Sequence, residues 1–304
     1  MTPTPGVLRR VVPQWQGGEN HAYPLGGAGL LAWLAPQTGE LTVESPLSAP
    51  SSSPLPLEDG LAARANLMTQ MLEIRRTLDQ HAPDRVVIFG GDCLVNQAPL
   101  AWLNERHGGK LGILWLDAHP DVASPRDRTR AHTMVLGNLL GQGDAEMARE
   151  VPTPIERSRV MMVGLSRLLP YEAEAIETLG LRPLAKEQVE SSSEHILGWI
   201  RDEGITRLAI HLDLDVLDPQ LFRSQGFAVP GVVLEGIMAE RVGSMTFAQV
   251  LRIICDVSAV SDVVGLGITE HMLWDAINLR DTLAGIPILS GSCSEQGKTP
   301  PLRA

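Results

Sequence analysis

Cysteine is scarce in this chain: its 304 residues include only three, Cys93, Cys255 and Cys293, and these lie far apart. Small secreted domains use closely spaced cysteines as a disulfide framework, and no such pattern occurs here. The N-terminus, Met1-Thr2-Pro3-Thr4-Pro5, also lacks the apolar segment of a signal peptide. We therefore expect a protein of the reducing cytoplasm.

Long apolar runs and an excess of positive charge are also missing. No stretch of about 18 apolar residues occurs, so we expect no membrane-spanning segment. Lysine and arginine number 25 against 36 aspartates and glutamates, and the formal net charge is −11. Because nucleic-acid binding requires clustered basic residues, a nucleic-acid partner is disfavoured. The hydrophobic content of 44% is ample for a folded core.

What the chain does contain is a set of apolar runs that end in acids. These are Leu111–Leu116 before Asp117 and Asp121, Arg207–Leu212 before Asp213 and Asp215, and Val263–Ile268 before Glu270. Such runs are typical of strands buried on both faces of a parallel sheet. Ligands of these sheets bind beyond the carboxyl ends of the strands. We therefore expect the acids to converge on one edge of a sheet.

Strands and helices are predicted to alternate along the chain. Further strands are expected at 6–13, 85–89 and 159–163, and helices at 60–81, 93–107, 132–140, 170–179, 193–203, 244–256 and from Leu273 onwards. Asp59-Gly60 is expected to open the first helix, and Ser244 to cap a later one. Residues 44–58 are a proline- and serine-rich loop by composition, and 216–243 form a second long loop. This pattern predicts one α/β domain over residues 1–304, with a mainly parallel sheet covered on both faces.

The acids at two of the strand ends have a spacing that suits a cation. Asp117, His119 and Asp121 alternate, as do Asp213 and Asp215, and alternate residues of an extended segment point the same way. Clustered carboxylates repel one another unless they are neutralised, and neither group contains a lysine or arginine. Oxygen ligands with an imidazole suit a divalent metal. For each group taken alone, the alternative is a helix cap or a turn.

Three segments resemble the signature blocks of the arginase/agmatinase (ureohydrolase) family. They are Gly90-Gly91-Asp92-Cys93, Asp117-Ala118-His119-Pro120-Asp121 and His211–Pro219. The resemblance extends over about residues 85–285 and implies a three-layer α/β/α fold. It also implies an amidinohydrolase that releases urea from a small guanidino compound at a paired Mn²⁺ centre, and a homo-oligomer, either a trimer or a hexamer.

The resemblance implies a set of metal ligands. These are Cys93, Asp117, His119, Asp121, Asp213 and Asp215. Asp117 and Asp213 would each bridge both metals, and Asp121 would bind one metal together with Cys93. The family has a histidine in the place of Cys93.

The resemblance also implies catalytic residues. Asp121 or His132 would pass a proton to the leaving amine, and Glu270 would pair with the guanidinium of the substrate. His211 and His271 have no implied role and are expected to be structural.

Cys93 is the main departure from the family pattern. A thiolate is softer than an imidazole, so it favours Zn²⁺, Fe²⁺ or Co²⁺ over Mn²⁺. The alternatives are that this metal site is weak or empty, or that Cys93 is a nucleophile, for which the family provides no nearby base.

The segments expected to set specificity also differ from those of arginases. Residues 165–170 contain no acid that could hold an α-amino group, and Glu172 is the first one after them. The loop at 218–243 is long and apolar, so a tail less polar than that of free arginine is expected. Two other classes stay open: an arginase-like binding or scaffold protein that has lost the chemistry, and a single-zinc deacylase on the related deacetylase-type fold.

Overall fold

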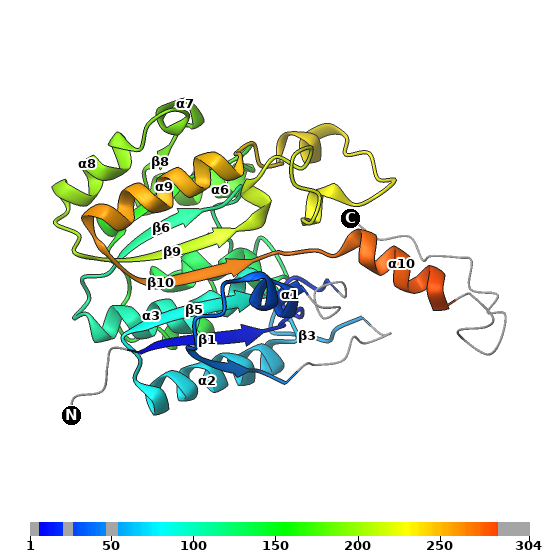
Figure 1. The fold of residues 1–304 in the computed structure, drawn as a ribbon, viewed down its shortest axis with the longest axis horizontal. Coiled ribbons are helices and arrows are strands. Elements are labelled where there is room, and N and C mark those ends of the chain that lie inside the picture. Colours follow the sequence, from blue (N-terminus) through cyan, green and yellow to red (C-terminus); the bar gives the residue numbers. More distant parts are fainter. Residues whose placement is uncertain (1–5, 21–26, 47–53, 285–304) are drawn as a thin grey trace.

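The computed structural model describes residues 6–20, 27–46 and 54–284, and its centre is an eight-stranded sheet (Figure 1). The strand order is β2-β1-β5-β10-β9-β6-β7-β8, and all neighbouring strands are parallel. The strands are β1 (Val7–Val12), β2 (Leu41–Glu44), β5 (Arg85–Gly90), β6 (Gly112–Leu116), β7 (Val160–Val163), β8 (Pro183–Leu184), β9 (Arg207–Asp213) and β10 (Asp262–Thr269). A second, antiparallel sheet consists of β3 (Leu57–Glu58) and β4 (Leu61–Ala62).

Helices cover both faces of the large sheet. They are α1 (Gly27–Leu34), α2 (Arg64–His81), α3 (Gln97–Arg106), α4 (Val135–Leu139), α5 (Ala145–Arg149), α6 (Pro170–Leu179), α7 (Lys186–Val189), α8 (Glu194–Asp202) and α9 (Phe247–Val260). The last helix, α10 (Trp274–Ala284), lies beyond the end of β10 and covers neither face (Figure 1). Buried side chains of α2 to α6 form one hydrophobic cluster with Ile113 and Trp115 of β6, while those of α7 to α9 form another with Leu114 and Leu116. Successive strand residues therefore face opposite layers, and the expected three-layer α/β/α fold is confirmed.

The six predicted strands all occur, each within one residue of its expected bounds. The helix starts are less accurate. The helices expected at 93–107 and 132–140 each begin with a 3-10 turn, Cys93–Asn96 and Ala131–Met134, before α3 and α4 follow. None of the helices in the described part of the chain combines the length and the hydropathy needed to cross a membrane.

Three local predictions were wrong. Asp59-Gly60 does not open a helix but turns the β3–β4 hairpin, with φ angles of 48° and 86°, as Asp-Gly pairs do in tight hairpins. Thr246, not Ser244, caps α9, because its hydroxyl accepts from the Gln249 N–H and the Gln249 side chain accepts from the Thr246 N–H. The loop expected at 44–58 is shorter, since β2 and β3 occupy its two ends and residues 47–53 lie outside the described part.

The strand register brings the carboxyl ends of four strands together. His211 of β9 pairs with Trp115 of β6 on one side and with Gly267 of β10 on the other. Asp213 pairs with Thr269 in the same way, and β5 lies next to β10. The loops after β5, β6, β9 and β10 therefore start side by side, which places their polar side chains at one edge of the sheet.

Candidate metal centre

The candidate carboxylates and the candidate thiol lie at this edge, and each of these residues is at least nine-tenths buried. The residues are Cys93, Asp117, Asp121, Asp213, Asp215 and Glu270. Within the described residues, all of them except Asp213 form three groups with His119, His132 and His211, and in each group one ligand atom per residue lies within 4.8 Å of all the others. Buried acids at this density need either protons or cations to neutralise them.

The first donor group consists of Cys93, Asp117, Asp121 and His211. Its members come from the loops after β5 and β6 and from β9 itself. Two of its buried atoms, Oδ2 of Asp121 and Nε2 of His211, have no hydrogen-bond partner. Unpartnered buried polar atoms are rare in folded proteins, so their presence here indicates a ligand position.

The second donor group consists of Asp117, His119 and Asp215. Nδ1 of His119 lies 3.0 Å from Oδ2 of Asp215 and 3.6 Å from Oδ1 of Asp117. Asp117 therefore belongs to both donor groups. A carboxylate has two oxygens and can bridge two cations, one on each side.

Asp213 lies beside the first donor group rather than in it. Its Oδ2 accepts a hydrogen bond from the Cys93 thiol, with 2.9 Å between sulfur and oxygen, and its Oδ1 accepts from the Asp215 N–H at 2.7 Å. The structure thus brings Asp213 to Cys93 but not into any of the three groups. Its bridging role stays a prediction.

The third group joins Cys93 to the two residues expected to act on substrate. Oε1 of Glu270 lies 3.5 Å from Nδ1 of His132 and 3.7 Å from Sγ of Cys93. Glu270 has a left-handed backbone with φ of 65°, and Asp121 has one with φ of 50°. Backbone strain in residues other than glycine is common at functional sites, where the surrounding structure holds it in place.

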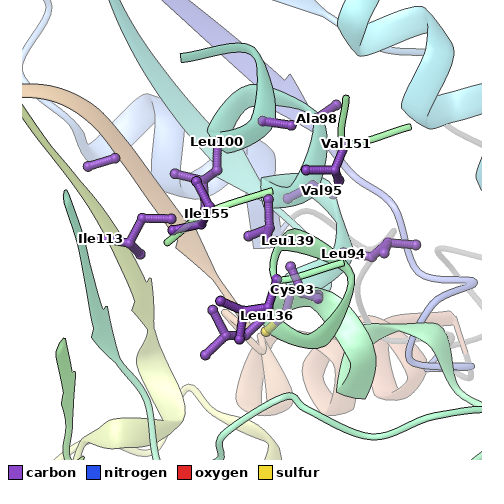
Figure 2. Close-up of a cluster of buried hydrophobic side chains, with 14 of the residues drawn as sticks. Cys93, Leu94, Val95, Ala98, Leu100, Ile113, Leu136, Leu139, Val151 and Ile155 are labelled. Atoms are coloured by element: carbon purple, nitrogen blue, oxygen red, sulfur yellow. The ribbon is translucent and has the colours of Figure 1, made fainter. Parts of the chain in front are cut away.

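The Gly90-Gly91-Asp92 segment explains how Cys93 is positioned. The buried carboxylate of Asp92 accepts from the N–H groups of Gly17 at 2.9 Å and of Leu94 at 3.0 Å, which fixes the turn that begins at Cys93. A side chain at Gly91 would collide with the carbonyl oxygen of Gln14. Figure 2 shows Cys93 in the hydrophobic cluster together with Leu136 of α4.

Burial and mutual repulsion shift the pKa values of the acids. Burial, aided by the charge of Asp117, raises the pKa of Asp121 well above its usual value, and burial with the charges of Asp215 and Asp117 does the same for Asp213. Burial would also raise the pKa of Asp117, but the nearby imidazoles of His119 and His211 outweigh it and lower that pKa. A divalent cation would relieve this repulsion.

Two further shifts concern the thiol and the imidazole of the third group. Burial, together with the charges of Asp213 and Asp121, raises the pKa of the Cys93 thiol well above its usual value. Burial lowers the pKa of His132 to about 3, with the charge of Arg130 acting in the same direction. A thiol in these surroundings is a poor nucleophile unless a cation binds it.

Sequence reasoning did not assign His211 to this edge. A signal was nevertheless present, because His211 precedes Asp213 by two residues in β9, and alternate strand residues share a face. His271 is held outside the three groups, with Nδ1 3.1 Å from the Gly27 carbonyl oxygen. Cys255 is exposed, and Cys293 lies outside the described residues.

A hollow of about 500 Å³ lies within the long loop between β9 and α9. Phe227, one of its lining residues, packs against the ring of His119, with centroids 5.4 Å apart. None of its twelve lining residues is acidic, and Arg223 is the only cation among them. The hollow therefore provides no counter-charge for an ammonium group.

Glu172, the nearest acid after residues 165–170, is already engaged. Arg241 donates two hydrogen bonds to its carboxylate, at 2.7 and 2.8 Å, and a third to the carbonyl oxygen of Arg167 at 2.8 Å. Both side chains are more than nine-tenths buried. The pair fastens the end of the long loop to the start of α6.

Replacing Arg241 by alanine should lower the free energy of unfolding by about 3–5 kcal/mol, because the charge of Glu172 would remain buried without a counter-charge, although the Leu169 N–H still donates to it. Chemical denaturation measures this change. Arg201→Ala is a matched control, since its pair with Glu194 is exposed and its loss should leave stability unchanged. Equal stability of the two variants would show that the buried pair does not hold the loop.

The parallel sheet and the shared carboxylate at its edge define an α/β protein with a candidate binuclear metal centre. A family model described as the arginase family matches residues 56–271, which is more than half of the chain. The chain therefore belongs to the arginase family.

Individual relatives agree with this assignment. An arginase of Agrobacterium fabrum (strain C58 / ATCC 33970) is 28% identical over 219 residues, which are 66% of this chain and 64% of the relative. The chain covers less than two thirds of the length of the first curated relatives that it matches.

Solved structures share the fold. The arginase of Bacillus caldovelox superposes with a TM-score of 0.71 at 17% identity, over 88% of this chain and 91% of its own. A proclavaminate amidino hydrolase of Streptomyces clavuligerus superposes with a TM-score of 0.59 at 19% identity, over 88% and 84%.

Proposed function

We propose that this protein hydrolyses a C–N bond of a guanidino or related amidine-type group in a small molecule, with divalent cations held by the first and second donor groups. The observation that carries the proposal is that Asp117 belongs to both groups. Membership of the arginase family supports it. Following the family, we also propose one domain and a cytoplasmic homo-oligomer, a trimer or a hexamer.

The donor atoms fit such cations. Oδ2 of Asp121 and Nε2 of His211 are buried and have no hydrogen-bond partner. A cation bound to both atoms would provide each with a partner. When bound, divalent cations supply a water of lowered pKa and a counter-charge for the clustered carboxylates. The mixture of carboxylate, imidazole and thiol suits Zn²⁺, Co²⁺ or Fe²⁺ as well as the Mn²⁺ expected from the family.

The residues of the third group have the chemistry for the organic steps. Burial raises the pKa of Glu270 to about 8, although a hydrogen bond from the Cys93 N–H partly opposes it. A guanidinium beside Glu270 would restore its carboxylate and form a charge-assisted pair. His132, whose pKa burial lowers to about 3, stays neutral at neutral pH and can accept a hydrogen bond from an N–H of the substrate, while Asp121 can carry a proton to the leaving amine.

The hollow beside His119 favours a substrate tail without an ammonium group. We expect kcat/KM for 4-guanidinobutyrate to exceed that for L-arginine by roughly tenfold or more, because an α-ammonium would lose water without gaining a partner. Urea release with each compound measures this ratio. Arg223→Gln should reduce the preference for the carboxylate tail, whereas Arg201→Gln, on α8, should not. An equal or higher value for L-arginine would contradict this choice of tail.

Elemental analysis followed by a urea-release screen over guanidino compounds tests the function itself. We expect two divalent cations per chain and urea from at least one compound. A protein that binds no cation and releases no urea would instead be an arginase-like scaffold. One zinc per chain with acyl hydrolysis would indicate the deacylase alternative.

A further inference from the structure

His211 is held in place on both sides. Its ring stacks on Trp115 of β6, with centroids 3.7 Å apart and an interplanar angle of 15°. On the other side, the side-chain amide of Asn96 lies 2.7 Å from Nδ1. This amide occupies the space above Gly267 of β10, where any side chain would collide with it. The ring therefore has one orientation.

The second ring nitrogen has no such partner. Nε2 of His211 is buried and makes no hydrogen bond. It lies 3.5 Å from Oδ2 of Asp117. Trp115 already donates to that oxygen at 3.0 Å. A buried nitrogen without a partner is costly, and a ligand bound to Nε2 would remove that cost.

One other atom of the first donor group is unpartnered as well. Oδ2 of Asp121 is also buried and unpartnered, and ligand atoms of His211, Asp121, Asp117 and Cys93 lie within 4.8 Å of one another. An asparagine amide can present its oxygen to an Nδ1–H, which leaves the Nε2 lone pair free. Histidine ligands of metals are commonly oriented in this way by a hydrogen bond at the other nitrogen.

We propose that His211 supplies the imidazole ligand of the first metal site, beside Cys93, and that Asn96 positions it. The inference rests on the proposed metal-dependent function. It means that the imidazole expected at position 93 is provided by His211 of β9, two strands away from β5 in the sheet, so the first site has an imidazole as well as the thiol of Cys93. The first site would then have a donor set of one sulfur, one nitrogen and carboxylate oxygens, which suits borderline cations such as Co²⁺ and Zn²⁺.

Cobalt provides a test that does not depend on activity. Wild-type protein loaded with Co²⁺ should bind two ions per chain and show a thiolate-to-cobalt charge-transfer band from Cys93, which Cys93→Ser removes. In His211→Ser the charge-transfer band should also disappear, although Cys93 is still present. The cobalt content of this variant should fall to one ion per chain. His195→Ser is the matched control, because His195 is exposed on α8.

A second variant, in which the imidazole is moved from position 211 to position 93, distinguishes the loss of a metal ligand from a loss of folding. Cys93→His introduced into His211→Ser should bring the content back to two ions per chain, because it restores an imidazole to the same donor group. Asn96→Ala should keep the band but weaken cobalt affinity by roughly 10–100-fold, as expected for a residue that orients a ligand. Circular dichroism of each metal-free variant establishes that it is folded.

The outcomes separate this inference from the proposed function. If wild-type protein binds two ions and His211→Ser keeps both ions and the band, His211 is structural and the inference is wrong, while the proposed function stands. If wild-type protein binds no cation, both fail. A His211→Ser variant that binds one ion and recovers the second only with Cys93→His would establish the assignment.

Discussion

Asp117→Asn is expected to remove both cations and to lower urea release by roughly a thousandfold or more, the upper range for losing one electrostatic group of an active site. Asp117 is the one residue shared by the first and second donor groups. The asparagine oxygen can still accept from the His119 N–H, which Asp117 now accepts at 2.6 Å, but its NH2 group cannot accept from the Trp115 ring N–H as Asp117 does, so circular dichroism should establish that the variant is folded. Elemental analysis and a urea assay measure the two effects.

Asp202→Asn is the matched control for this experiment. Asp202 is exposed at the end of α8, so its replacement removes a carboxylate of the same kind without touching the sheet edge. It should keep both cations and full activity. An Asp117→Asn protein that still holds two cations would show that the sharing of Asp117 is not what builds the centre.

The metal-free protein should lose stability as pH rises from about 5 to above 8. Burial raises the pKa of Glu270 from 4.5 to about 8, and it also raises the pKa of Asp121 and Asp213. Below pH 4.5 Glu270 is protonated in both the folded and the unfolded state, whereas above pH 8 the folded state must bury its charge. The stability that the bound proton provides is therefore lost across this window.

Added cations should reverse this loss. A cation at 100 times its dissociation constant stabilises by about 2.7 kcal/mol, which for a chain of this length corresponds to a rise in Tm of roughly 4 °C. The rise should be larger at pH 8 than at pH 6, because at pH 6 the cation must displace protons from the acids. Differential scanning calorimetry with and without Zn²⁺ measures both trends.

Glu270→Gln provides the control for the pH dependence. The amide keeps the size of the side chain but does not titrate, so the Tm of the metal-free variant should fall less steeply between pH 5 and 8. A Tm of the wild-type protein that rises over this range, or that does not respond to Mn²⁺, Co²⁺ or Zn²⁺, would contradict a buried cluster of acids that awaits a cation.

The strands were predicted well from the sequence because a buried parallel strand appears in it as a continuous apolar run. Apolar runs such as Leu111–Leu116 and Arg207–Leu212 are long enough to be recognised without any tertiary information. The acids that follow them could be placed at one edge because right-handed crossovers put all carboxyl ends on the same side. The gathering of Asp117, Asp121 and Asp215 follows from topology alone.

Features that depend on contacts between distant residues could not be predicted. Asp59-Gly60 has the composition of a helix start and of a hairpin turn alike, and pairing between β3 and β4 decides between them. The role of His211 depends on its neighbours in two other strands, Trp115 and Gly267. The pairing of Glu172 with Arg241, 69 residues away, likewise has no local signal.

Two donors of the first group, Asp117 and His211, stand directly after β6 and on β9, which are hydrogen-bonded to each other, and this has a consequence for recognition of the ion. Because the sheet already fixes the backbone of Asp117 and His211, a cation that binds has little conformational entropy to remove. Affinity would then be governed by the cost of stripping water from the ion. A rigid site of this kind selects ions by radius and softness. Substitutions that make the sheet less rigid should therefore reduce the selectivity for one metal over another before they abolish metal binding.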